Sequence, residues 1–188
     1  MIAGHFGFAA IVKARAPRVP LWSLMLACQW MDIVFIPLFV AGLEKMVPAT
    51  GADPGAYGNA IIHADLTHSL LGALALSILF GVAFGLRWGR SSGLILGGVV
   101  FSHWVLDLIT HRADMPLLPN NAGGFPRMGF GLWRWPVANA ALELVIVVAG
   151  AALYWRAAQK VGGKRALLPA AMVLGFGLLT LGLNVAGM

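Results

Sequence analysis

Two histidines and an aspartate recur at four-residue intervals within an apolar stretch of this 188-residue chain. His103, Asp107 and His111 would lie on roughly one face of a helix, each about 6 Å beyond the last. Neutral imidazole and carboxylate groups are standard ligands of zinc and related divalent ions. An aspartate placed between two histidines can also bridge two such ions. The spacing therefore predicts a metal site that has Asp107 at its centre.

Other ionisable side chains lie inside or at the ends of further apolar segments. A charged group within a bilayer is costly unless it is paired, bound to metal or facing a polar cavity. At about 1.5 Å per helical residue, Asp32 and His103 both lie about 15 Å from the same membrane face. We therefore expect one cluster, whose candidate metal ligands are His5, Asp32, His63, His68, His103, Asp107, His111 and Glu143.

Some of these candidates also have ordinary structural explanations. His63 could be a solvated residue at the start of a helix that Asp65 caps. His111 could lie at the membrane interface, and Glu143 could pair with Arg134. A histidine inside a membrane can also simply hydrogen-bond to a neighbouring helix. The sequence leaves these alternatives open, although an unpaired aspartate at that depth is much harder to accommodate.

The composition is that of a membrane protein. Hydrophobic residues make up 60% of the chain, charged residues 11%, and the mean hydropathy is +0.84. A helix needs about 20 apolar residues to cross a bilayer, and five segments meet or approach that length. They lie near Leu21–Leu43, Ala64–Leu86, Ser92–His111, Val137–Trp155 and Ala166–Val185. We therefore predict an all-α integral membrane helical bundle of about five transmembrane helices, forming a single domain over residues 1–188.

A sixth apolar segment, residues 1–14, is long enough only for a half-span. The stretch between Pro17 and Pro20 ends it, because proline cannot continue a helix interior. We therefore expect a short N-terminal half-span helix that carries His5 back toward the middle of the membrane.

The basic residues set the expected orientation. The net charge is +6, but lysines and arginines form short clusters between apolar runs rather than a nucleic-acid-binding surface. One side of the predicted bundle carries nine of the 13 and the other side four. The positive-inside rule places the first side, which includes Lys13, Arg15 and Arg18, in the cytoplasm. We expect a multi-pass inner-membrane protein in contact with membrane lipids, without a nucleic-acid partner.

Two other classes of function fit the same residues. Intramembrane acids are the usual mark of ion- or proton-conducting proteins, in which Asp32, Asp107 and Glu143 would form a relay. Alternatively, two histidines such as His68 and His103 could be the axial ligands of a haem. The relay needs no bound metal, and a haem needs no neighbouring aspartate. Both are alternatives to a metal-dependent enzyme.

Four segments together resemble a known family. They are Ala3-Gly4-His5, Trp30-Met31-Asp32, a stretch that contains Thr67-His68-Ser69-Leu70-Leu71, and a stretch that contains Ser102-His103 and Asp107. These motifs resemble those of the membrane-bound metal-dependent hydrolases, also called LexA-binding, inner-membrane-associated hydrolases. The similarity covers about residues 1–120. That family is itself distantly similar to zinc-dependent phospholipase C and P1 nuclease, which are all-helical phosphoesterases with a zinc cluster.

The resemblance implies a set of ligands, residue by residue. The positions that match metal ligands are His5, Asp32, His68, His103 and Asp107. Asp107 would bridge two ions, and His111 matches a further histidine of the family. The soluble enzymes continue with His-x-x-x-Glu, but here Asn139 stands four residues before Glu143. One or two zinc ions, or other divalent ions, are therefore expected rather than three, and an inactive partner-binding scaffold is a further alternative.

The residues and the resemblance together lead to a functional hypothesis. The chain is expected to be a metal-dependent hydrolase that acts on a lipid or a lipid-linked (phospho)ester. The metal would activate a water molecule and polarise the ester or phosphoryl oxygen. A carboxylate that is not fully engaged by the metal, Asp32 or Asp65, would accept the proton.

Overall fold

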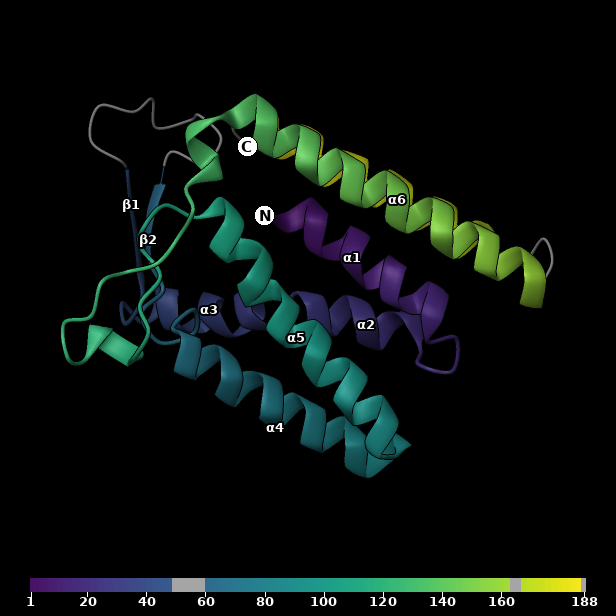
Figure 1. Ribbon diagram of the computed structural model, residues 1–188, viewed down its shortest axis with the longest axis horizontal. Coiled ribbons are helices and arrows are strands. Elements are labelled where there is room, and N and C mark those ends of the chain that lie inside the picture. Colours follow the sequence, from purple (N-terminus) through teal and green to yellow (C-terminus); the bar gives the residue numbers. More distant parts are fainter. Residues whose placement is uncertain (49–59, 163–166, 187–188) are drawn as a thin grey trace.

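The computed structural model describes residues 1–48, 60–162 and 167–186, and it is mostly helical (Figure 1). Two short 3-10 helices, η1 (Pro119–Asn121) and η2 (Leu132–Arg134), lie in the connection between the fifth and sixth α-helices. The α-helices are α1 (Ile2–Arg15), α2 (Leu21–Cys28), α3 (Trp30–Val40), α4 (Leu70–Trp88), α5 (Arg90–Thr110), α6 (Pro136–Gly162) and α7 (Leu167–Val185). This architecture confirms the predicted all-α bundle with a short N-terminal helix.

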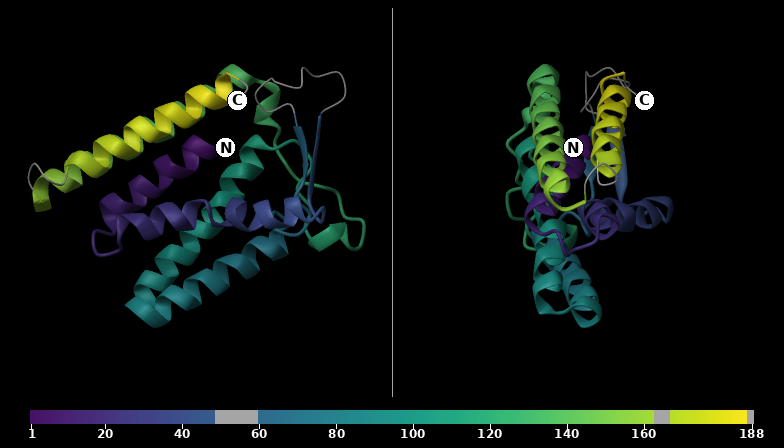
Figure 2. Two further views of the ribbon diagram at one scale, coloured as in Figure 1. Left: turned by 180° about the vertical axis from the view of Figure 1, so that it is seen from behind. Right: turned by 90° about the vertical axis from the view of Figure 1, so that its right-hand side faces the viewer.

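Among the described residues, four helices are long and apolar enough to cross a membrane: α4, α5, α6 and α7. They expose large apolar side chains, including Leu79, Leu86, Val145 and Leu179, as expected for helices that face lipid. A fifth span exists only if α2 and α3 are counted together, because they meet at a bend of 47°. Figure 2 shows α7 running beside α6, against which it packs.

The predicted span Leu21–Leu43 is therefore not one straight helix, because it breaks at Gln29. Gln29 has φ −112° and ψ 5°, and α3 begins at the next residue. The carbonyl group of Cys28 at the break accepts a hydrogen bond of 2.7 Å from Nδ1 of His103. Hydropathy does not reveal the break, because the sequence is strongly apolar on both sides of it.

The second span begins at Leu70 rather than at Ala64. Ser69 caps the helix, since its Oγ atom accepts the backbone N–H of Gly72 at 3.0 Å. The expectation that Asp65 caps this helix is wrong. Residues 64–69 instead form a turn between a strand and α4, and that turn presents a histidine to the bundle.

A small sheet that the sequence did not predict precedes this turn. Strand β1 (Lys45–Pro48) pairs antiparallel with β2 (Ala60–His63), with Lys45 opposite His63. The alternative in which His63 lies at the start of a helix is therefore wrong. Each strand has only four residues, too few for an alternating pattern to stand out in such an apolar chain.

Helix α1 lies in the middle of the bundle, packed closely against α6 (Figure 1). A Cβ atom on Gly7 would lie 2.7 Å from the carbonyl group of Ile146 in α6. A Cβ atom on Gly150 of α6 would overlap the carbonyl oxygen of Gly7. Glycine at both positions thus allows the two backbones to touch, which sets the depth at which α1 carries His5.

The substitution Gly150→Ala should therefore destabilise the bundle. Overpacking of this kind costs about 1–3 kcal/mol, because the new methyl group meets backbone rather than a movable side chain. The matched control is Gly175→Ala in α7, where a Cβ atom would have no neighbour within 4 Å. Thermal unfolding in detergent, followed by tryptophan fluorescence, should show a lower melting temperature for Gly150→Ala alone. Equal effects of the two substitutions would contradict the close packing of α1 on α6.

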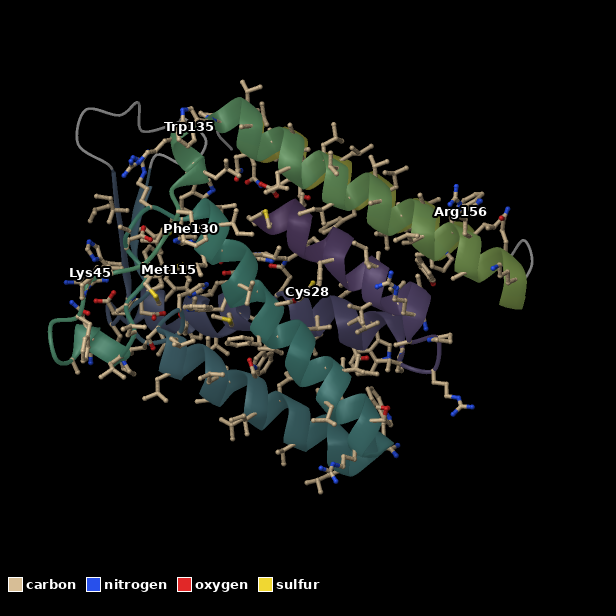
Figure 3. The ribbon with its side chains drawn as sticks, in the orientation of Figure 1. Cys28, Lys45, Met115, Phe130, Trp135 and Arg156 are labelled. Atoms are coloured by element: carbon tan, nitrogen blue, oxygen red, sulfur yellow. The ribbon has the colours of Figure 1, made fainter. Side chains whose placement is uncertain are left out.

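Basic residues lie at both ends of the bundle, and several of them belong to helix ends that lie together at one end. The C-terminal ends of α1, α4 and α6 and the N-terminal end of α5 lie at one end of the bundle (Figure 1). The basic residues Arg15, Arg87, Arg156 and Arg90 belong to these helix ends. Figure 3 shows Arg156 at this end and Lys45 at the opposite end. The arrangement is compatible with the orientation that the positive-inside rule predicts, with Arg156 on the cytoplasmic side.

Cysteine labelling tests this orientation. Cys28 is the chain's single cysteine and it is buried, so a membrane-impermeant thiol reagent should leave it unmodified. A cysteine that replaces Phe130, which is 75% exposed on the predicted outer side, should react in intact cells. A cysteine that replaces the exposed Gln159 should react only after the membrane is opened. Labelling of the cysteine at position 159 alone in intact cells would show that the predicted orientation is reversed.

Candidate metal centre

Asp107 of α5 is surrounded by histidine nitrogens. Its Oδ2 atom lies 3.1 Å from Nε2 of His103 and 3.7 Å from Nε2 of both His68 and His111. Its Oδ1 atom lies 3.1 Å from Nε2 of His5 and 3.2 Å from the amino group of the first residue. All five of these side chains are buried. The predicted cluster thus forms, and it joins α1, α5 and the turn before α4.

Asp32 adds a second carboxylate to the cluster from α3. Its Oδ1 atom lies 3.5 Å from Nε2 of His68 and 3.5 Å from Nε2 of His103. Its side chain is 37% exposed, in contrast to the buried side chain of Asp107. Asp32 therefore lies at the accessible edge of the cluster.

The ring nitrogen of His103 that faces away from the cluster has a defined partner. Nδ1 lies 2.7 Å from the carbonyl oxygen of Cys28, which can only accept a hydrogen bond, so Nδ1 carries the proton. In a neutral imidazole the other nitrogen, Nε2, then has a free lone pair that faces the carboxylates. Nε2 of His103 is buried and makes no well-oriented hydrogen bond among the described residues, although it lies 3.1 Å from Oδ2 of Asp107 and 3.5 Å from Oδ1 of Asp32. This orphaned acceptor is the feature that a bound cation would satisfy.

His68 and His111 are held in the same way. Nδ1 of His111 lies 3.0 Å from a carboxylate oxygen of Asp114. Nδ1 of His68 lies 2.8 Å from the hydroxyl group of Thr67, which in turn contacts both carboxylate oxygens of the buried Glu44 at 3.0 and 3.1 Å. The hydroxyl donates to Glu44 and so accepts from His68. Partners of this kind fix the tautomer and the ring orientation of metal-binding histidines.

The distances between the facing atoms match those expected around a shared cation. Two groups of three ligand atoms lie within 4.8 Å of one another: His5, His103 and Asp107, and Asp32, His68 and His103. Donors about 2.1 Å from one tetrahedral zinc ion lie about 3.4 Å apart, and the separations around Asp107 Oδ2 are 3.1–3.7 Å. Nitrogen and carboxylate donors also suit zinc and related divalent ions. The residues therefore fit one or two divalent cations.

Helix α1 is tied to both the cluster and α6. The ring of His5 stacks on His103 with centroids 3.8 Å apart and an angle of 13° between the rings. The backbone N–H of Gly4 donates to Oε2 of Glu143 at 3.0 Å, and Asn139 donates to Oε1 of Glu143 at 3.2 Å. Glu143 thus positions the helix that carries His5, and it belongs to neither three-ligand group.

Two predicted site residues lie elsewhere. His63 pairs with Lys45 in the small sheet and is in neither three-ligand group. Both carboxylate oxygens of Asp65 accept hydrogen bonds from Arg127, at 2.6 and 2.7 Å. These hydrogen bonds raise the pKa of Arg127 above its usual value. Arg127 also donates to the carbonyl oxygen of Asp114, so Asp65 anchors the loop that follows α5 and is engaged there rather than at the histidines.

Sequence reasoning missed the outer partners of the histidines: Glu44, Thr67 and Asp114. The last two had a local signal, since they lie one and three residues from His68 and His111. Glu44 had no such signal, because it reaches Thr67 only through the fold, from a position 23 residues away in the chain. Its charge inside an apolar protein was the one available hint.

The contacts between the histidines also bear on the haem alternative. A bis-histidine haem needs a flat porphyrin between the two axial nitrogens. Here the Nε2 atoms of His68 and His103 both lie within 3.7 Å of Asp107 Oδ2 and 3.5 Å of Asp32 Oδ1. The carboxylates occupy the space that a porphyrin would need, so this pair does not fit a haem.

The hydrogen-bonded chain from Glu44 through Thr67 to His68 should strengthen cation binding. Loss of such an outer partner typically weakens metal affinity about 10–100-fold. With zinc added as the test cation, we expect Glu44→Gln and Thr67→Val to lose it to a competing chelator at correspondingly lower chelator concentrations than the unmodified protein. Thr180→Val is the matched control, since the hydroxyl of Thr180 bonds only to carbonyl groups of its own helix. Unchanged zinc affinity in both site variants would show that the hydrogen bonds from His68 through Thr67 to Glu44 do not strengthen cation binding.

Comparison with known proteins agrees with this geometry. A family model described as YdjM inner membrane protein matches residues 2–186, nearly the whole chain. No curated protein and no solved structure matches the chain. The match covers all six residues that the structure brings together, His5, Asp32, His68, His103, Asp107 and His111. The chain therefore belongs to the YdjM inner membrane protein family, which is the LexA-binding, membrane-bound metal-dependent hydrolase family.

Proposed function

We propose that this protein is an integral membrane hydrolase that depends on one or two divalent cations, which we assign as zinc. The observation that carries the proposal is the convergence of four buried imidazole nitrogens on the carboxylate of Asp107. The family match supports the reaction class, and the burial of the cluster supports a bound cation rather than a solvated acidic patch. The cation would be held by Asp107, Asp32, His5, His68, His103 and His111.

The two carboxylates are suited to different tasks. A divalent cation supplies a Lewis acid and lowers the pKa of water toward neutrality. Asp107 is buried and enclosed by four histidines, so its role is to hold charge and to fix the histidine rings. Asp32 is the accessible carboxylate, and we assign it the role of general base that accepts the proton from the attacking water. Asp65 is withdrawn from that role, because Arg127 engages both of its oxygens.

The surroundings of Asp32 support a lipid or a lipid-linked phosphoester as the substrate. Ile33 and Ile36 on the same helix are 40% and 58% exposed, which offers an apolar surface beside the accessible carboxylate. Helix α3 also makes few contacts with α4 and α5. An ester at the head of an apolar chain could reach Asp32 along this side while its tail remains in the bilayer.

Zinc content provides the first test. The double substitution His103→Ala and Asp107→Ala removes a residue from each three-ligand group, so retained zinc should fall at least about tenfold. Elemental analysis after size-exclusion chromatography measures this, and the chromatogram checks that the variant remains folded. His63→Ala, outside the cluster, should keep its zinc. Full zinc content in the double variant would contradict the site.

The role of Asp32 is tested separately by Asp32→Asn, which preserves the shape of the side chain. Release of phosphate or alcohol from phospholipids and lipid-linked phosphoesters should fall about 100-fold or more, and by a larger factor than the zinc content, which is measured on the same sample. A zinc-loaded unmodified protein that hydrolyses none of these substrates would instead favour the partner-binding scaffold. Asn139 stands where the soluble enzymes have a histidine, and it donates a hydrogen bond to Glu143. The absence of that histidine is compatible with the partner-binding scaffold.

A further inference from the structure

A cavity lies at the opposite end of the bundle from the histidine cluster. It has a volume of about 590 Å³ and lies between the C-terminal parts of α1 and α6. Its walls combine apolar side chains with four cations, and its lining includes Lys13, Arg15, Leu153, Tyr154, Arg156 and Lys160. The candidate membrane span of α6 ends at Lys160, so the cavity lies where the membrane core meets the polar layer. Figure 3 shows Arg156 at this end.

The cations of this cavity have no acidic partners within the part of the chain that the structure describes. All seven acidic residues lie between positions 32 and 143, and none lies in α1 or in the last 45 residues. Among the described residues, no lysine or arginine at this end lies within 4.0 Å of an acidic oxygen. Four positive charges so close to an apolar boundary repel one another, and an external anion would relieve that repulsion.

One of the four cations is held in place by the backbone. Nζ of Lys13 donates hydrogen bonds to the carbonyl oxygens of Pro17 and Val19, at 2.9 and 2.7 Å. An ammonium group has three donors, so one remains for a ligand. Lys13 therefore closes the turn after α1 and at the same time keeps a positive charge beside the cavity.

We propose that this cavity binds an anionic phospholipid of the cytoplasmic leaflet. The phosphate lies among Lys13, Arg15, Arg156 and Lys160, and an acyl chain follows the apolar wall beside Leu153 and Tyr154. A lipid fits better than a soluble anion, because the cavity pairs a cationic rim with an apolar wall at membrane depth. Basic pockets between membrane helices on the cytoplasmic side recognise lipid headgroups in this way.

The test compares two double variants of the full-length protein in detergent. Arg156→Gln with Lys160→Gln removes two charges from the cavity, whereas Arg87→Gln with Arg90→Gln removes two charges from the same side outside it. Native mass spectrometry measures binding of dioleoylphosphatidylglycerol, with dioleoylphosphatidylcholine as the neutral comparison. We expect the unmodified protein to prefer the anionic lipid by at least about fivefold. The cavity variant should lose this preference and the control variant should keep it.

Other outcomes have equally definite meanings. Equal loss in both double variants would reduce the effect to general surface charge and overturn the proposal. Binding of both lipids with the same affinity would also overturn it. Stabilisation by inorganic phosphate as strong as that by the anionic lipid would identify a soluble anion as the ligand. Arg156→Lys with Lys160→Arg should retain the preference, which separates lost charge from damaged folding. None of these measurements depends on the histidine cluster.

Discussion

The buried negative charge of Asp107 is the constraint on which the rest of this structure depends. A carboxylate enclosed by apolar helices is stable only if its charge is balanced and its oxygens have partners. Four histidines face its oxygens, and they come from α1, from α5, and from the residues just before α4 and just after α5. His68, His103 and His111 present Nε2 lone pairs rather than protons, so a shared cation would supply the balancing charge. The cluster therefore joins α1 and α3 to α5, with which each of them makes few other contacts. A divalent cation among these donors would bind them more tightly still.

The site is built where regular structure ends. The break at Gln29 exposes a carbonyl group that binds His103, and the turn before α4 places Thr67 and His68 beside Glu44. After α5, the backbone N–H groups of Phe130 and Gly131 bond to the carbonyl groups of Leu108 and His111, so the following loop closes over the last histidine. Uninterrupted helices would satisfy these backbone groups internally and leave the histidine rings without fixed outer partners.

Chemistry and charge are divided between the two ends of the bundle. The described acidic residues gather around the histidine cluster and its supporting loops, while one end of the helices carries only basic residues. Such a division suits an enzyme that acts in the membrane. The cationic end orients the chain against the anionic leaflet, and the cluster lies toward the other side. The proposed lipid cavity and the proposed hydrolytic centre can then act on different lipids without competing.

The sequence by itself determined the membrane bundle and the short N-terminal helix, and it predicted a cluster of eight candidate ligands that contained the six residues found together. It could do so because intramembrane charge and helical spacing are local properties of the chain. The resemblance to a family supplied five of these residues as ligands and matched His111 to a further histidine, but His63 and Glu143 remained candidate ligands and Asp65 a candidate proton acceptor. Only the tertiary structure separated them. In the tertiary structure His63 lies in a sheet and Asp65 accepts a hydrogen bond from Arg127. Glu143 accepts one from the backbone of Gly4, and Glu44 accepts one from Thr67. These assignments depend on contacts between residues far apart in the chain, which hydropathy and spacing do not encode.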